Sequence, residues 1–93
     1  MNSDTEVKVP LGRLVATPNA IESLPPEDIQ AALRRHVTGD WGDLCTEDKL
    51  VNDNALIRGD RLFSAYHSET GVKFYVITEW DRSVTTVLLP EDY

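Results

Sequence analysis

Residues 61–89 constrain the fold of this chain most, because they contain three successive segments with the alternating pattern of β-strands. The middle segment, 72–80, is rich in β-branched and aromatic residues, which suit a half-buried pleated surface. One face of it carries Val72, Phe74, Val76 and Trp80, and the other carries Lys73, Tyr75, Ile77 and Glu79. Segments 61–67 and 84–89 have the same character, so we expect a strand in each.

The connections between these segments, 68–71 and 81–83, are short and polar. Gly71 can adopt the positive φ that a hairpin turn of this kind requires. Parallel neighbours need a long crossover connection, so connections this short predict an antiparallel meander with 72–80 in the middle. Pro90 has no amide donor and is expected to end the last strand.

Helical signals precede the strands. Thr17 and Pro18 form an N-cap followed by a first-turn proline, which predicts a short helix over 18–24 with Ala20, Ile21 and Leu24 on one side. A second helix is predicted over 26–38, since acids open it, arginines close it and apolar residues recur at helical spacing.

A third helix is expected between Thr46, as its N-cap, and Gly59, as its stop. We expect its core-facing side chains to be Leu50, Val51, Ala55 and Ile57. Asn54 lies close to this stripe, and its amide is expected to bind the backbone of a neighbouring loop.

These elements predict an α+β protein. We expect a three- to four-stranded antiparallel sheet, in which residues 11–16 supply the fourth strand, with two or three helices on one face. The length of 93 residues suits one domain with one modest core. We interpret residues 1–8 as a disordered N-terminus and residues 9–93 as a single α+β domain.

Charge and cysteine content narrow the possible functions. The formal net charge of −7 argues against binding to a phosphate backbone, which requires clustered lysine and arginine, and it permits a basic protein partner. The same charge is also explained by solubility alone. A single cysteine, Cys45, with no apolar run long enough for a membrane helix and no signal-peptide pattern at the N-terminus, predicts a reducing cytoplasm.

The motifs of common enzyme classes are absent from the sequence. The glycines form neither a dinucleotide-binding nor a P-loop pattern, and no CxxC or HExxH spacing occurs. Cys45, His36 and His67 match no recurring zinc spacing, so we expect no metal and no cofactor. We interpret His36 as a packed or dipole-paired histidine, His67 as a cross-strand packing residue, and Cys45 as a small buried residue with a reactive thiol as the alternative.

Acidic residues gather around the start of the third helix, with a tryptophan among them. The group consists of Asp40, Trp41, Asp43, Glu47 and Asp48. One interpretation is a solvated helix cap, with Trp41 anchoring the loop to the core; the other is a partner-binding surface, with Trp41 as apolar anchor and the carboxylates as steering charges. Trp80, between Glu79 and Asp81, is a secondary candidate of the same kind.

Several segments of the chain resemble a family of small bacterial proteins carried on plasmids and integrated genomic islands. The segments are 12–18 (GRLVATP), 39–45 (GDWGDLC), 47–49 (EDK), 64–66 (SAY), 77–79 (ITE), 81–86 (DRSVTT) and 88–93 (LLPEDY). The resemblance covers nearly the whole chain from residue 11 onward and implies that the protein belongs to a mobile genetic element. Members of the family are mostly labelled hypothetical or plasmid-related, and no functional residue is carried over from them.

Three functions remain open from the sequence. The first is a non-enzymatic acidic protein-binding module of a mobile element that inhibits or regulates a host or element protein. The second is a small enzyme or ligand-binding module that uses residues 40–48. The third is a homo-oligomeric structural module joined through an exposed sheet edge, for example as a homodimer.

Overall fold

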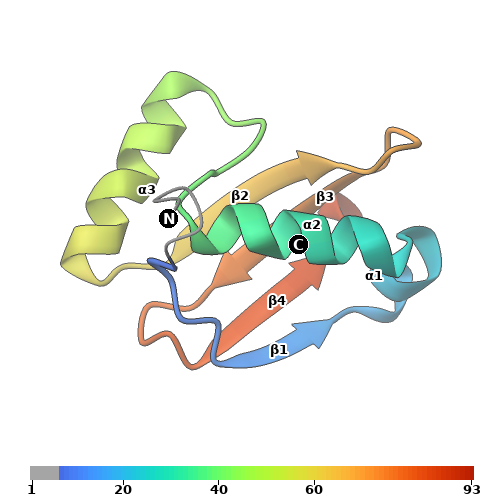
Figure 1. Cartoon of the computed structure of the whole chain (residues 1–93), viewed down its shortest axis with the longest axis horizontal. Coiled ribbons are helices and arrows are strands. Elements are labelled where there is room, and N and C mark those ends of the chain that lie inside the picture. The colour runs from blue at the N-terminus through green and yellow to red at the C-terminus, as the bar shows by residue number, and fades with distance from the viewer. Residues whose placement is uncertain (1–6) are drawn as a thin grey trace, which may run out of the picture.

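The structure is a computed structural model that describes residues 7–93. Within these residues it has the predicted α+β fold, with three α-helices and a four-stranded sheet (Figure 1). The elements in chain order are β1 (Arg13–Ala16), α1 (Pro18–Ser23), α2 (Pro26–Val37), α3 (Thr46–Arg58), β2 (Leu62–His67), β3 (Lys73–Thr78), β4 (Val84–Leu88) and the 3-10 helix η2 (Pro90–Asp92). Most of the segment predicted to be disordered lies outside the described residues, but the amide of Lys8 donates to the Val37 carbonyl oxygen at 2.7 Å.

The strands are ordered β1-β4-β3-β2 in the sheet. β2, β3 and β4 form the predicted antiparallel meander. The prediction of a purely antiparallel sheet is wrong for β1, which pairs with β4 in parallel, Leu14 beside Thr85. Short connections dictate antiparallel pairing only within the meander. Three helices and two strands lie between β1 and β4 in the chain, so no local constraint fixes the direction of β1.

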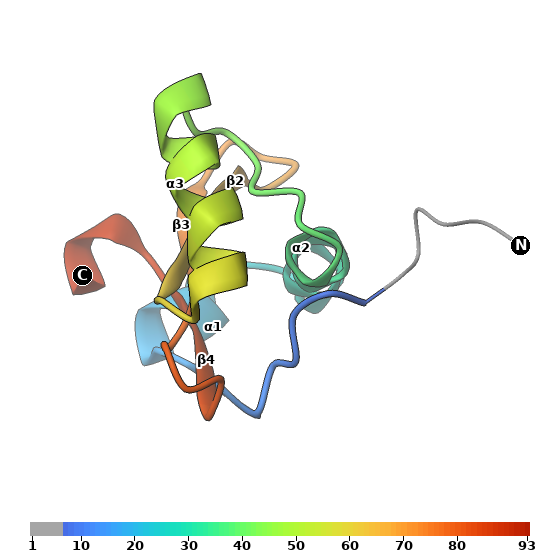
Figure 2. The same cartoon turned by 90° about the vertical axis from the view of Figure 1, so that its left-hand side faces the viewer.

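The helix α2 covers one face of the sheet, and η2 lies on the opposite side (Figure 2). Between α2 and the sheet, Ala32 packs with Phe74 and Val76, and Leu33 is partly buried against the same cluster. Ala20 of α1 and Leu24, which follows the helix as its C-cap, belong to this core. Thr17 caps α1, as predicted, because Thr17 Oγ1 accepts from the Ala20 amide at 3.2 Å.

The third helix, α3, does not share the face that α2 covers but packs along β2, the edge strand of the meander (Figure 1). Its N-cap is Cys45 rather than the predicted Thr46, and it ends, as predicted, at Gly59 in the left-handed conformation with φ of 83°. Cys45 is exposed, contrary to the prediction of a buried residue, because the start of α3 extends into solvent.

The outer edge of β2 is closed by two sets of hydrogen bonds. The Asn52 side chain donates to the Phe63 carbonyl oxygen at 2.6 Å and accepts from the Phe63 amide at 3.0 Å. The Ala65 amide donates to the Trp41 carbonyl oxygen, and the Ala65 carbonyl oxygen accepts from the Asp43 amide at 2.7 Å. The backbone-binding asparagine of α3 is therefore Asn52, not Asn54 as predicted.

The side chains of α3 that contact the core differ from the prediction. Asn52 and Ala55 are buried, whereas Leu50, Val51 and Ile57 are exposed by 56%, 65% and 84%. The apolar residues of this helix are spread around its axis, so the side facing β2 was decided by the Asn52 contact rather than by an apolar stripe. Ile21 was predicted to lie on the same side of the first helix as Ala20 and Leu24, but it is exposed whereas those two residues are buried.

Candidate functional site

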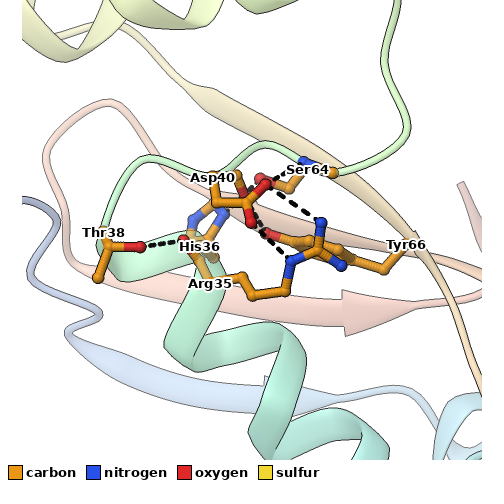
Figure 3. Close-up of polar contacts among 7 residues, drawn as sticks. Arg35, His36, Thr38, Asp40, Ser64 and Tyr66 are labelled. Atoms are coloured by element: carbon orange, nitrogen blue, oxygen red, sulfur yellow. Dashed lines mark hydrogen bonds and ion pairs between the residues drawn. The ribbon is translucent and has the colours of Figure 1, made fainter. Parts of the chain in front are cut away.

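A polar cluster joins the C-terminal end of α2 to β2 (Figure 3). Arg35 forms a two-point ion pair with Asp40, with Nε–Oδ2 at 2.7 Å and Nη2–Oδ1 at 3.2 Å, and its guanidinium lies 4.9 Å from the centre of the Tyr66 ring. Tyr66 Oη donates to the Asp40 carbonyl oxygen at 2.6 Å. The hydrogen bond from Arg35 lowers the pKa of Asp40, and burial raises the pKa of Tyr66. Asp40 is therefore engaged in contacts within the protein that join α2 to β2.

The loop that follows α2 is held tightly against β2. Gly42 forms a parallel bridge with Ala65, and its amide donates to Asp40 Oδ1 at 3.1 Å. Its φ is +79°, and a Cβ built there would overlap the Ala65 carbonyl oxygen and the Tyr66 ring. Only glycine fits this close approach between two backbones.

Trp41 lies inside the molecule. Its side chain is 3% exposed, its Nε1 donates to Asp53 Oδ1 at 2.9 Å, and its ring meets the His36 ring edge-on with centroids 5.7 Å apart. This geometry matches the interpretation in which Trp41 anchors the loop to the core. The buried side chain of Trp41 lacks the exposed surface that the alternative interpretation, an apolar anchor at an interface, requires.

His36 lies at the centre of a buried chain of hydrogen bonds. Thr85 Oγ1 donates to the Leu11 carbonyl oxygen at 2.8 Å, so Thr78 must donate in its 2.7 Å contact with Thr85. Thr78 then has no proton left for His36, so His36 Nε2 carries the hydrogen and donates to Thr78 at 2.9 Å, while Nδ1 accepts from Ser64 Oγ at 2.7 Å. Burial, followed by the charge of Arg82, lowers the pKa of His36 to about 4. The sequence-based interpretation of a packed histidine is confirmed.

The remaining acids of the predicted group are exposed. Asp43 Oδ2 lies 2.7 Å from His67 Nδ1, and both side chains are about half exposed. Glu47 and Asp48 lie in the first turn of α3, where the helix dipole favours carboxylates. An Asp–His pair can polarise a nucleophile, but in residues 7–93 no hydroxyl or thiol is hydrogen-bonded to the other ring nitrogen of His67.

The turn between β3 and β4 presents the second predicted tryptophan. Trp80 is 66% exposed. Arg82 has a positive φ of 62°, an unfavourable conformation for a residue other than glycine. Its guanidinium donates to four carbonyl oxygens, those of Ala55, Asp60, Glu79 and Trp80, at 2.6–3.3 Å. These bonds tie the turn that carries Trp80 to the C-terminal end of α3.

Two shallow hollows flank β2. The larger, of about 320 Å³, lies between α3 and the sheet and is lined by Leu44, Asp48, Val51, Asn52, Arg61 and Phe63. It is where a ligand bound by the predicted 40–48 region would lie. The smaller, of about 190 Å³, lies beside Arg35, Tyr66 and His67.

Neither a metal-binding cluster nor a membrane-spanning helix is found in residues 7–93. No group of three or more histidine, cysteine, aspartate or glutamate side chains within 7–93 is arranged to hold a metal ion. None of the helices in this part of the chain has both the length and the apolar character needed to cross a bilayer.

Comparisons of the chain with models of protein families, with curated proteins and with solved structures found no match. The resemblance to plasmid- and island-encoded proteins therefore stays a prediction. The exposure of Leu50 and Ile57 does not follow from the sequence, whose pattern predicts that both face the core. The sequence does contain one indication of how α3 packs, which is Asn52. Its side-chain amide can satisfy the unpaired backbone groups of an edge strand only if it faces the sheet.

Proposed function

We propose that the protein is a non-enzymatic protein-binding module that docks on its partner through the α3 face, which we define as Glu47, Asp48, Leu50, Val51 and Ile57. The observation that carries the proposal is the exposure of the three apolar side chains in this set, which ranges from 56% to 84%. Helix α3 docks on β2 through Asn52 and Ala55, so these side chains are not needed for the fold. Leu50 and Ile57 are seven residues apart, so they lie on the same side of α3, and exposed apolar residues that share a side are typical of interaction surfaces.

The charge of the surface indicates the chemistry of the partner. Glu47 and Asp48 border the apolar residues, Asp43 lies just before them, and the chain as a whole carries a net charge of −7. A partner with an apolar groove rimmed by lysine and arginine would complement this surface. Exposed charges of this kind mainly accelerate association, so binding should weaken as salt is added.

The β3–β4 turn supplies a second point of contact. Exposed tryptophans on rigid supports are preferred anchors at interfaces, because little side-chain freedom is lost on binding. Trp80 has such a support in Arg82, and Glu79 and Asp81 flank it with the same negative charge. The turn contacts the C-terminal end of α3, so one partner can reach both.

The resemblance noted from the sequence suggests where the partner comes from. A small acidic module of a plasmid or genomic island would act in the cytoplasm on a protein of the host or of the element itself. Occupying a basic surface on that protein would inhibit or regulate its binding to other molecules.

The test begins with a photo-crosslinking residue at Ile57, and with Ile21 as the matched control, because Ile21 is 63% exposed on a different helix. Crosslinked protein is identified in the producing cell, purified, and titrated by calorimetry. The Leu50→Ala, Ile57→Ala double variant should weaken binding by about tenfold or more, while Ile21→Ala leaves it unchanged.

Charge is tested separately with Glu47→Lys and Asp48→Lys. Together they should slow association and flatten its salt dependence. A purified partner that binds the apolar double variant and the Ile21→Ala variant with equal affinity would show that α3 is not the docking surface. Equal crosslinking at the two positions would lead to the same conclusion.

A further inference from the structure

The two edges of the sheet differ in how their backbone is satisfied. The edge at β2 is closed by Asn52 and by the loop around Gly42. At the other edge, the amide of Arg13 donates to the carbonyl oxygen of Ser83, just before β4, and the amide of Thr17 donates to that of Val87 in β4. The N–H and C=O groups of Leu14 and Ala16 therefore point away from β4. β1 is the last strand on this side of the sheet, and no hydrogen bond from the described part of the chain reaches these groups. An uncovered edge of this kind is a template for a further strand.

We propose that β1 pairs antiparallel with β1 of a second copy, so that the two four-stranded sheets join into one across a two-fold axis. In the register we infer, Leu14 lies opposite the partner subunit's Ala16, and the outward peptide groups of these two residues form the hydrogen-bonded pairs. Val15 then meets the partner subunit's Val15 on the axis. Because the β2 edge is closed, the pairing ends at a dimer.

The side chains match in this register. Leu14 and Ala16 neighbour Thr85 and Val87 of β4, so both belong to the face that α2 covers. Leu14 is 48% exposed, and the pairing places this large side chain beside a small alanine twice in the dimer. Val15 is β-branched, which suits the central cross-strand pair. Alternation of large and small side chains allows the two strands to pack without a gap.

The charges match as well. The same register sets Arg13 opposite the partner subunit's Thr17, and Thr17 Oγ1 donates to Asp92 Oδ2 at 2.7 Å. Each Arg13 is thus brought near an Asp92 carboxylate of the other copy. Residues 7–18 contain Lys8 and Arg13 and no acid, so this edge avoids the repulsion expected elsewhere between two copies with a net charge of −7.

Neighbouring registers are less favourable. Shifting the strands in one direction would pair Leu14 with the partner subunit's Pro18, which has no amide hydrogen to donate. Shifting them in the other direction would pair Ala16 with Gly12, whose φ of +63° is not that of an extended strand. The inferred register is the one in which Leu14 and Ala16 both find complete partners.

The dimer is tested by sedimentation equilibrium of the full chain from micromolar to millimolar concentration. We expect a mass that rises from 10.4 kDa towards twice that value. Arg13→Glu should weaken dimerisation by about tenfold or more, because it is repelled by Asp92, whereas Lys49→Glu, the same charge change on α3 beside the opposite edge, should leave it unchanged.

Hydrogen exchange locates the interface independently of these variants. Exchange at the amides of Leu14 and Ala16 should slow as wild-type protein is concentrated, and exchange at the amides of β2 should not change. Three results would overturn the proposal: a monomeric mass at every concentration, equal effects of the two charge variants, or a dimer in which the Leu14 and Ala16 amides exchange at a rate independent of concentration.

Discussion

Mild acid should destabilise this protein through His36. The imidazole is fully buried, and both ring nitrogens are used in hydrogen bonds, to Ser64 and Thr78. Burial lowers its pKa from 6.5 to about 4. The unfolded chain therefore binds a proton on His36 more readily than the folded protein does. As the pH falls between these two values, the free energy of unfolding must decrease.

The size of the effect follows from the difference between the two pKa values. Stability from neutral His36 is fully present above the unfolded value of 6.5 and is lost as the pH falls towards about 4. Each unit of difference corresponds to about 1.4 kcal/mol, so the loss is about 2 kcal/mol between pH ~7 and pH ~5, and about 3 kcal/mol by pH ~4. The pKa values of Asp40 and Asp81 are lowered from 3.8, so protonation of these carboxylates destabilises the fold only in stronger acid.

Urea unfolding followed by tryptophan fluorescence measures this loss, since Trp41 packs against His36. With an m-value of about 1 kcal/mol/M, the midpoint should fall by about 2 M between pH ~7 and pH ~5. His36→Gln should be less stable at neutral pH but nearly insensitive to pH over this range. His67→Gln, which removes the exposed histidine instead, should keep the full wild-type dependence.

Two outcomes would refute this reasoning. One is a wild-type midpoint that does not change between neutral pH and pH ~5. The other is an equal change in His36→Gln, which would assign the pH dependence to other groups. Either result would mean that the buried chain of hydrogen bonds tolerates a charged imidazole.

Two further predictions concern the closed β2 edge. Asn52→Ala should destabilise the protein by about 2–3 kcal/mol, because the Phe63 amide and carbonyl lose their partners, while Asn54→Ala, on the exposed side of α3, should change the urea midpoint little. Gly42→Ala should lower the thermal midpoint far more than Gly59→Ala: both residues have positive φ and so cost about 1–2 kcal/mol in strain, but only at Gly42 would the new Cβ overlap backbone. Wild-type midpoints for Asn52→Ala, or equal midpoints for the two glycine variants, would contradict these assignments.

Local chemistry determined much of the fold from sequence alone. The ends of α1 and α2 follow from Thr17 and from the prolines after it, because caps and first-turn prolines act on neighbouring backbone. The strand β3 follows from alternation over 72–80, and the meander from its short connections. In each case, the residues that decide the structure lie within a few positions of the residues they affect.

The tertiary structure decided which surfaces those elements bury. Trp41, a loop residue next to an acid, lies in the core, whereas Ile57, an apolar residue of α3, lies in solvent. The environment of both residues depends on where α3 meets β2. Nothing in the sequence around Leu14 indicates that β1 pairs with β4 in parallel. A candidate site on α3 and an open edge at β1 are therefore properties of contacts between distant segments, and such contacts are set by the packing of the whole chain.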